Sequence, residues 1–327
     1  MTARADFSFF HGSAWAKVLA ESYGFTPVYF TAGKADEIKS VLPLMEVNSW
    51  LTGRRGIGLP FTDECEPLGT NSKTFQELFQ TAVEFGKTRG WKSIECRGGR
   101  KLFGEAPASL SFYGHVVQLV SDADKQFEKM DSSVRRAVRK AEKDGVTVVV
   151  SQSLDATRDF YSLQCRTRKR HGLPPQPFSF FLNVHRHILS QNRGMVAVAS
   201  HGGRKIAAAV YFFLGGRAIY KYGASDLAHQ HLRANNLVMW EAIKWLARKG
   251  ATQLDLGKTS LAHEGLRRFK LQFGATEHAI EYLKFDLQQA KYVIETDGVA
   301  GWHNRVFRAM PVFMSRLAGS LLYKHWA

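Results

Sequence analysis

The stretch AIKWLARKGATQLD at residues 242–255 has the pattern of a helix that ends at a glycine and is followed by a short strand. The stretch AVEFGKTRGWKSIE at residues 82–95 has the same pattern 160 residues earlier. In both, glycine stands where a helix that ends in the left-handed conformation prefers it. We interpret this correspondence as a tandem duplication, and the alternative is chance recurrence of a common helix–strand step.

The elements around these two stretches repeat in outline, because each half is predicted to contain a helix, three strands, a helix and a strand. In the first half, helices are predicted at 13–22 and 73–88 and strands at 28–31, 39–47, 57–61, 91–96 and 115–119. In the second half, helices are predicted at 133–143, 154–170, 179–190, 237–249 and 264–273, and strands at 146–150, 195–200, 205–214, 217–223, 253–256 and 278–286.

Length and charge limit the class of protein and of partner. A chain of 327 residues is long enough for two domains, and its 45% hydrophobic and 23% charged content excludes a disordered or fibrous protein. The 45 Lys and Arg outnumber the 29 Asp and Glu, which gives a net charge of +16. An anionic partner is therefore expected, whether nucleic acid, an acidic membrane surface or a phosphorylated substrate.

Cysteines and apolar runs indicate the compartment. The three cysteines lack C-x-x-C spacing, so neither a disulfide framework nor a cysteine zinc site is expected. Residues 1–10 have no apolar core of a secretory signal, and the longest apolar run, 206–214, is too short to span a membrane. We expect a cytoplasmic protein. Peripheral attachment to the inner face of the membrane is compatible with this expectation.

A predicted helix at 133–143 concentrates positive charge. Its apolar residues recur at helical spacing, so its cations lie around the other face. Within 134–143 a single acid, Glu142, accompanies five cations, and such an imbalance is repulsive unless an anion is bound. The alternative is an ordinary solvated amphipathic helix. The cations are Arg135, Arg136, Arg139, Lys140 and Lys143.

Two further basic segments lie towards the C-terminus. The cluster at 166–171 falls at a helix end, where the helix dipole already favours cations. The segment 302–327 has four Lys and Arg and no acid, and Pro311 should interrupt its helix. Its apolar stripe (Val306, Met310, Phe313, Leu317, Leu321) is expected to pack on the protein body, and the alternative is contact with a membrane surface.

Several enzyme signatures are absent from the sequence. There is no G-x-x-x-x-G-K-[ST] phosphate loop, no G-x-S-x-G elbow and no H-E-x-x-H. His185 and His187 stand two apart on a predicted helix and would not share a face. No metal site is expected, and hydrolysis by a metal or a serine triad has no support.

Four blocks in the second half, in this order, carry a family resemblance: YKYGAS (220–225), NNLVMWEAI (235–243), DLGK (255–258) and GLRRFKLQFG (265–274). His11 with Trp15, LPL (42–44) and LPF (59–61) extend it to the first half. The chain resembles the GNAT-fold acyltransferases of the Fem type (FemAB-like) and their relatives with a BioF2-like acetyltransferase domain. It is similar to Fem-like proteins associated with bacterial exopolysaccharide and exosortase systems.

The resemblance implies an α/β (α+β) fold of two tandem GNAT-like (acyl-CoA N-acyltransferase) domains, each a mixed, mainly antiparallel sheet flanked by helices. We expect a degenerate N-terminal domain at 1–125, a basic junction helix and strand at 126–150, a transferase domain at 151–290 and a basic amphipathic tail at 291–327.

The resemblance also implies site residues. The lysine of the F-K-x-x-F-G block, Lys270, would stabilise negative charge during transfer. Asp255 would orient the acceptor or accept its proton, although a strand-end aspartate also caps turns. Tyr220 and Tyr222 alternate with Lys221, so both tyrosines are predicted to point one way, with Tyr222 placing the acceptor. The further substrate-binding residues expected are Lys17, Arg135, Arg136, Arg139 and Lys140 for phosphates, with Tyr220, Asn236 and Phe269.

The donor is left open by the sequence. GNAT acetyltransferases hold the coenzyme A pyrophosphate on a glycine-rich loop, and the corresponding residues 230–235 read QHLRAN. Fem enzymes also lack that loop and use aminoacyl-tRNA, which the positive charge would suit. No tightly bound cofactor is expected, and the candidate co-substrates are acyl-CoA, acyl carrier protein and aminoacyl-tRNA.

The sequence thus predicts an N-acyl or aminoacyl transferase acting on a cell-envelope or exopolysaccharide precursor. The acceptor would be a small molecule or a lipid-linked sugar or peptide. The alternative hypotheses are a non-catalytic GNAT-fold module that binds a membrane and a protein that binds RNA without chemistry.

Overall fold

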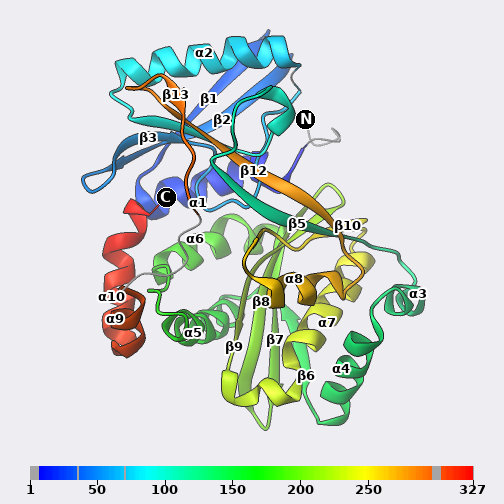
Figure 1. The fold of residues 1–327 in the computed structure, drawn as a ribbon. Coiled ribbons are helices and arrows are strands. Elements are labelled where there is room, and N and C mark those ends of the chain that lie inside the picture. The colour runs from blue at the N-terminus through cyan, green and yellow to red at the C-terminus, as the bar shows by residue number, and fades with distance from the viewer. Residues whose placement is uncertain (1–6, 35–36, 70, 297–302, 327) are drawn as a thin grey trace.

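The described part of the chain, residues 7–34, 37–69, 71–296 and 303–326 of the computed structural model, contains a 13-stranded sheet (Figure 1). Its strands follow the order β1-β2-β3-β4-β12-β5-β10-β9-β8-β7-β6, with β11 beside β5 and β13 beside β12. The strands are β1 (Thr26–Gly33), β2 (Ile38–Ser49), β3 (Gly53–Ile57), β4 (Ser93–Arg97), β5 (Leu110–Gln118), β6 (Thr147–Ser151), β7 (Gly194–His201), β8 (Arg204–Leu214), β9 (Arg217–Ser225), β10 (Gln253–Asp255), β11 (Thr259–Ser260), β12 (Thr276–Asp286) and β13 (Lys291–Tyr292).

Helices lie on both faces of this sheet. They are α1 (Ser13–Tyr23), α2 (Ser72–Thr88), α3 (Ala123–Glu128), α4 (Ser132–Lys143), α5 (Leu154–Arg170), α6 (Phe178–His187), α7 (Ala234–Arg248), α8 (Glu264–Leu271), α9 (His303–Ala309) and α10 (Val312–Leu322). The 3₁₀ turn η5 (Tyr323–His325) follows α10. Most predicted helices and strands are therefore present, with ends that differ by a few residues.

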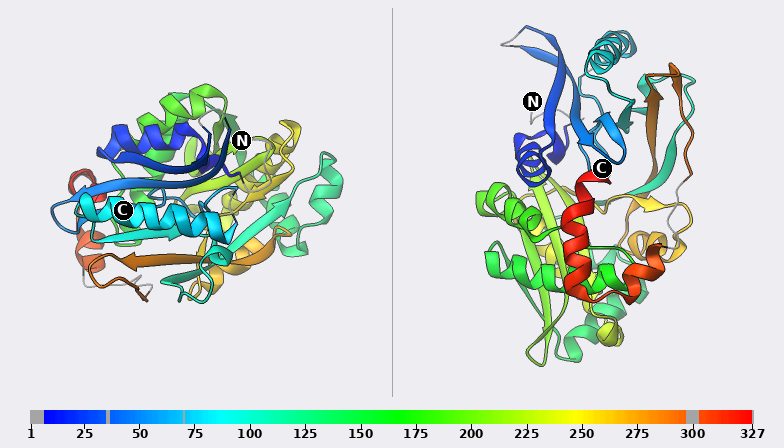
Figure 2. Two further views of the ribbon diagram at one scale, coloured as in Figure 1. Left: turned by 90° about the horizontal axis from the view of Figure 1, so that it is seen from above. Right: turned by 90° about the vertical axis from the view of Figure 1, so that its left-hand side faces the viewer.

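In the N-terminal half, one helix covers each face of the sheet (Figure 2). Leu42 and Leu44 of β2 pack in the cluster that includes α2, whereas Met45 and Val47 pack in the cluster that includes α1. This follows from the alternation of side chains along a strand. Nearly every residue at the centre of β2 is buried, as expected of a strand covered on both faces.

The C-terminal half repeats this arrangement with two helices on each face. Along β8, Ala208, Val210 and Phe212 pack in the cluster that contains α5 and α6. The alternate residues Ala209 and Tyr211 pack in the cluster that contains α4 and α7. The first of these clusters also contains residues of α1, β2 and β3, so one core joins the two halves of the chain.

Each half contains one parallel step, β3–α2–β4 and β9–α7–β10. The glycines after the two helices, Gly90 and Gly250, have φ of +69° and +82°, so the left-handed helix ends expected from the repeated stretch are confirmed. An antiparallel strand then lies beside each step, β12 beside β4 and β5 beside β10. The predicted fold class, a tandem pair of mainly antiparallel sheets flanked by helices, is confirmed.

These two flanking strands are exchanged between the halves. β12 comes from the C-terminal half of the sequence and completes the N-terminal sheet, whereas β5 comes from the N-terminal half and lies beside β10. β5 and β12 also pair with each other and so join the two sheets. The boundaries drawn at 125 and 290 therefore do not coincide with the division of the sheet.

The strand predicted at 57–61 is wrong. β3 ends at Ile57, and the chain then turns, with Leu59 and Phe61 in the left-handed region at φ of 43° and 62°. Leu59 is buried in the core, which is why this segment has the apolar composition of a strand.

The C-terminal segment forms two helices that break at Pro311, as predicted. α10 lies along the outside of α5 (Figure 1). The expectation that its apolar stripe packs on the body is wrong, because Phe313, Leu317 and Leu321 are 71%, 64% and 62% exposed. The side of α10 that faces the body carries the small residues Ser315 and Gly319 instead. Residues 297–302 and 327 of the predicted tail lie outside the described residues.

Candidate active site

A cavity of about 580 Å³ opens where β9 and β10 separate. The two parallel strands are paired for three residues, ending at Ile219 and Asp255. β9 continues to Ser225, whereas the chain after Asp255 leaves the sheet through Leu256. The cavity is lined by β9, by 256–258, by α8, by the end of α5 and by the start of α7. Because α5 and α7 cover opposite faces of the sheet, the cavity reaches both faces.

Lys270 is the most deeply placed cation of this cavity. It lies in the last turn of α8, and its side chain is 3% exposed. Its Nζ donates to the carbonyl oxygens of Gly257, at 2.7 Å, and Lys258, at 3.0 Å. An ammonium has three donors, so one remains for a ligand in the cavity. Gly257 has φ of +71°, a conformation that glycine adopts more readily than other residues. In this conformation its own carbonyl oxygen accepts from Lys270 Nζ.

Three lysines and one carboxylate lie on the cavity lining. Lys221 Nζ lies 2.9 Å from Oδ2 of Asp63, and both side chains are largely buried. Lys258 Nζ lies 4.0 Å from the centre of the Phe112 ring and 4.6 Å from that of Tyr282, within the range of cation–π attraction. With Lys270, the lining has three ammonium groups and one carboxylate.

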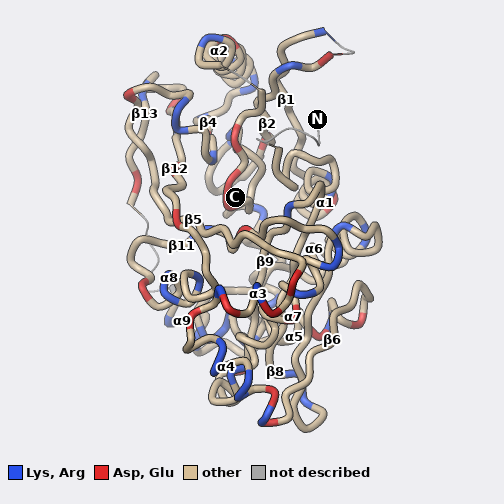
Figure 3. The backbone as a smooth tube through the Cα atoms, turned by 90° about the vertical axis from the view of Figure 1, so that its right-hand side faces the viewer, with Lys and Arg blue, Asp and Glu red and all other residues tan. Residues whose placement is uncertain are grey.

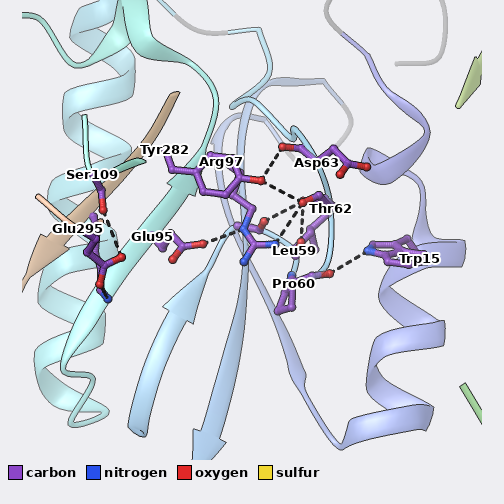
Figure 4. A network of polar contacts seen from close by, with 12 residues as sticks. Trp15, Leu59, Pro60, Thr62, Asp63, Glu95, Arg97, Ser109, Tyr282 and Glu295 are labelled. Carbon is purple, nitrogen blue, oxygen red and sulfur yellow. Dashed lines mark hydrogen bonds and ion pairs between the residues drawn. The ribbon is translucent and has the colours of Figure 1, made fainter. Parts of the chain in front are cut away.

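The turn at 59–63 positions Asp63. Tyr282 Oη donates to the backbone carbonyl of Asp63 at 2.7 Å, and Trp15 Nε1 donates to that of Pro60 at 3.3 Å (Figure 4). The donors come from β12 and α1, so elements from both ends of the chain hold this turn.

Burial sets the protonation of the cluster. It lowers the pKa of Lys258 and of Lys270 to about 8, because an ammonium is poorly solvated there. Burial alone would raise the pKa of Asp63, but the nearby ammonium groups, Lys221 first, hold it below its ordinary value. At neutral pH the cavity therefore has more positive charge than its own carboxylate neutralises, which suits an anionic ligand or a developing oxyanion.

Three of the predicted residues, Lys270, Tyr220 and Phe269, line this cavity together. Tyr220 is packed against Tyr211, and its pKa is raised to about 12 by burial, so it is a neutral phenol. The structure places these residues at one site, and their roles stay predictions.

Tyr222 does not point the same way as Tyr220, so that prediction is wrong. A bulge in the pairing of β8 with β9, between Val210 and Tyr211, interrupts the alternation. The Tyr222 ring packs among the phenylalanines of α5 and α6, and the Lys221 ammonium lies over that ring at 5.4 Å. Tyr222 is outside the cavity lining, and burial raises the pKa of its hydroxyl well above the ordinary value.

Asp255 also lies outside this lining. Its Oδ1 accepts a hydrogen bond from the Gly257 backbone N–H at 2.7 Å. This contact caps the turn after β10, which is the alternative to acceptor orientation given above for this residue. It borders a second cavity of about 230 Å³, together with Glu64, Glu66 and His278. Burial, followed by the neighbouring carboxylates, raises the pKa of Asp255 to about 6.

A cationic groove of about 480 Å³ runs between α4, α8 and the start of α7. Arg136, Lys140, Arg233 and Arg268 line it, and the described lining residues include no acid. Phe269 lines both this groove and the main cavity, so the two spaces are neighbours. Figure 3 shows the Lys and Arg residues concentrated along α4. Lys140 is paired with Asp144 at 2.5 Å, and the three arginines supply the remaining charge.

The other predicted binding residues are divided. Asn236 lines the cationic groove. Arg139 lies over the Phe127 ring at 5.4 Å, and neither it nor the half-buried Arg135 lines the groove. Lys17 is exposed on α1 and lines neither space. The structure therefore brings Arg136 and Lys140 together in one cationic groove but separates them from Lys17.

Asp63, Lys258, Arg233 and Arg268 were not selected from the sequence. Lys258 and Arg268 stand inside two of the blocks that carry the family resemblance, so they could have been found there. No sequence motif includes Asp63, because it follows the segment 57–61 that is predicted as a strand. Its partner Lys221 is 158 residues away in the sequence.

Two negative findings concern the described residues alone. Within them, no three His, Cys, Asp or Glu side chains form a group suited to hold a metal ion. None of the helices placed there is both long enough and apolar enough to cross a membrane.

Comparison with known proteins identifies the fold around the cavity. Residues 128–271, less than half of the chain, match the family model of the acetyltransferase (GNAT) domain. The match includes α4, the separation of β9 from β10, and Lys270. No curated protein matches the sequence.

Solved structures share the fold over most of the chain at low identity. The crystal structure of FemX superposes with a TM-score of 0.67 at 15% identity, covering 86% of this chain and 93% of that one. The C-terminal domain of a putative lysylphosphatidylglycerol synthetase from Agrobacterium fabrum gives 0.57 at 16% identity, covering 83% and 86%. A tandem GNAT protein from the clavulanic acid biosynthesis pathway gives 0.52 at 10% identity, covering 80% and 83%. Residues 128–271 therefore contain an acetyltransferase (GNAT) domain, which indicates an acyltransferase, and most of the chain shares the fold of these structures.

Proposed function

We propose that this acyltransferase joins an acyl or aminoacyl group to an amine of a cell-envelope or exopolysaccharide precursor. The observation that carries the proposal is the buried Lys270, which lines the cavity at the β9–β10 separation and has one free donor. The cationic groove beside that cavity supports a phosphate-bearing substrate. The Fem-like resemblance of the sequence supports the envelope or exopolysaccharide acceptor.

The reaction needs few groups from the protein. The acceptor nitrogen attacks the carbonyl carbon of the activated donor, a C–N bond forms, and the carbonyl oxygen becomes an oxyanion. The bond from that carbon to the thiol sulfur or ribose oxygen of the donor then breaks, and the proton lost by the amine ends on this leaving atom. The Lys270 ammonium would stabilise the oxyanion, a contribution worth about 10²–10³ in rate when one such donor is removed.

Asp63 is the acidic residue among the described lining residues of the cavity. Its ion pair with Lys221 holds it ionised, so it can accept a hydrogen bond from the neutral acceptor amine and orient the nitrogen for attack. We assign acceptor placement to Asp63, since Asp255 and Tyr222 lie outside the cavity lining.

The donor's phosphates would lie in the cationic groove. Arg233 adopts the left-handed conformation at φ of 56° immediately before α7, where a glycine-rich loop would otherwise present backbone N–H groups. In this chain arginine side chains take that place, and guanidinium groups bind phosphate through paired hydrogen bonds. Acyl-CoA, acyl carrier protein and aminoacyl-tRNA all carry phosphodiester or pyrophosphate groups, so this groove suits each of them.

The test is to offer the purified protein acyl-CoA, acyl carrier protein and aminoacyl-tRNA pools with amine acceptors and to identify products by mass spectrometry. Mass gain on an acceptor with one donor class is the expected result. No product from any donor, with properly folded protein, would contradict the assignment and favour the non-catalytic alternative.

The groove is tested with the substitutions Arg233→Gln and Arg268→Gln, made together. They should raise the donor KM at least tenfold with little change in kcat, and reduce the dependence of binding on salt, because two phosphate contacts are lost. The matched control is Arg193→Gln, an exposed arginine that lines neither the groove nor the cavity. Equal donor KM in both proteins would remove the groove from the proposal.

A further inference from the structure

We infer that the outer face of α10, together with the tip of the β2–β3 hairpin, docks on an anionic lipid bilayer. Such docking would hold the protein at a membrane whichever donor or acceptor it uses. We call this surface the docking face and define it by Phe313, Leu317, Leu321, Trp50 and Leu51.

The orientation of α10 is the first observation. Phe313, Leu317 and Leu321 are spaced by four residues, so they form one stripe along the helix, and each is more than 60% exposed. The opposite side is fixed by close packing, because a Cβ on Gly319 would lie 1.9 Å from the carbonyl oxygen of Pro175. Large apolar residues are thus held outward by a helix that packs through its small residues.

The hairpin tip extends this apolar surface. Trp50 is 80% exposed and Leu51 is 52% exposed, between β2 and β3. Ser49 Oγ lies 2.9 Å from Nδ1 of His325 in η5, and the Trp50 and His325 rings are 5.3 Å apart. The hairpin tip therefore lies against the turn that follows α10, and both segments carry exposed large apolar side chains, unlike the isolated exposed residues of an ordinary surface.

The charge around the docking face identifies its partner. Arg305, Arg308, Arg316 and Lys324 are exposed on the same two helices and η5, and residues 303–326 contain no acid. A second copy of the chain would bring the same four cations against these and would be repelled. On an anionic bilayer the apolar stripe can be buried at the boundary between headgroups and acyl chains, and the cations can contact the negative headgroups. Tryptophan prefers this interfacial region.

The helix lies on such a surface and does not cross it. α10 has 11 residues, about 17 Å at 1.5 Å per residue, against an apolar core of about 30 Å.

The experiment is vesicle co-sedimentation of the full chain with phosphatidylcholine alone and with 30% phosphatidylglycerol. We expect at least tenfold stronger partitioning of the wild type onto the anionic vesicles than onto phosphatidylcholine alone. The same measurement is made on the double variant Phe313→Ser with Leu317→Ser. Its partitioning onto the anionic vesicles should be at least tenfold weaker than that of the wild type. The matched control is Val149→Ser with Leu227→Ser, which removes two apolar side chains that are 62% and 56% exposed elsewhere.

A second readout locates the contact. Vesicles with brominated acyl chains should quench tryptophan fluorescence of the wild type, and Trp50→Phe should lose a measurable part of that quenching. Because all the substituted side chains are exposed, circular dichroism should be unchanged. Three outcomes would each overturn the inference. The two double variants could partition equally, or the wild type could bind neither vesicle. The wild type could also sediment as a dimer that Phe313→Ser with Leu317→Ser converts to a monomer.

Discussion

Replacing Lys270 with methionine should remove most of the transfer activity while leaving the protein folded. The substitution keeps an unbranched side chain that reaches the ε-carbon and deletes the ammonium that lines the cavity. Removal of one donor to an oxyanion lowers the rate of the chemical step by about 10²–10³ in enzymes, and we expect a fall of this size here. It corresponds to about 3–4 kcal/mol of lost transition-state stabilisation.

The effect of this substitution on stability has two opposing parts. A lysine whose pKa is lowered to about 8 is disfavoured as an ammonium by about 3 kcal/mol at neutral pH, and methionine removes that cost. The carbonyls of Gly257 and Lys258 lose their donor, and each unsatisfied carbonyl costs about 1–3 kcal/mol. The two parts nearly cancel, so the free energy of unfolding should change by no more than about 2–3 kcal/mol.

The pH dependence separates these parts. In the wild type, the unfolded chain binds more protons at this lysine than the folded chain between pH about 8 and its ordinary pKa of about 10.4. The unfolding free energy of the wild type should therefore rise relative to Lys270→Met across that interval and run parallel to it below pH 7. Chemical denaturation at a series of pH values measures this difference.

The assay for activity is single-turnover transfer with the donor found by mass spectrometry. Lys87→Met is the matched control, since Lys87 is an exposed lysine on α2 that lines neither the cavity nor the groove. Wild-type transfer by Lys270→Met would refute the assignment of the oxyanion to this residue. Loss of folding at pH 7 would refute the balance of stability terms.

Three further predictions test buried charges and packing in the fold. Asp255→Asn should raise the free energy of unfolding by up to about 3 kcal/mol above pH 6, because the wild-type carboxylate is disfavoured in the folded state, and the difference should fade as pH drops towards 4 in chemical denaturation. Glu46→Gln should lower it by about 1–3 kcal/mol at pH 7, since this buried carboxylate accepts from Arg89 Nε and Nη2 at 3.0 and 2.8 Å and from Trp91 Nε1 at 2.6 Å, and one amide oxygen cannot replace both carboxylate oxygens. The Arg89 pair holds the pKa of Glu46 below its ordinary value, so the loss should shrink at acid pH, where the wild-type carboxyl is itself neutral. Gly319→Val should release α10 from the backbone of Pro175, and limited proteolysis should cut the C-terminal segment sooner than in the wild type.

Much of the fold follows from local pattern. α5 begins and ends where its periodicity predicts, from Leu154 to Arg170, and the two helix-ending glycines are in the left-handed conformation. Lys270 was selected through family resemblance and is buried at the cavity lining. These features depend on residues close together in sequence, which is why the sequence alone predicts them.

Other features depend on contacts between distant segments. A bulge opposite Val210 turns Tyr222 into the core, and a single strand pattern has no sign of it. Asp63 reaches the cavity only because β12 and α1 hold the turn before it. The exposed stripe on α10 could not be told from a buried one, because helical spacing is the same in both cases and only the packing of Gly319 decides which side faces the body.

The exchange of β5 and β12 between the halves has a consequence for how the protein is made. A ribosome releases β1 to β4 long before residues 276–286, so the edge of β4 that β12 covers stays open on the nascent chain. An open strand edge can pair with other chains, and chaperones would have to protect it until β12 has been made. The β5 strand is likewise made early and waits for β10. The two halves are therefore not separable modules, and a chain cut between them would leave an unpaired edge on each piece.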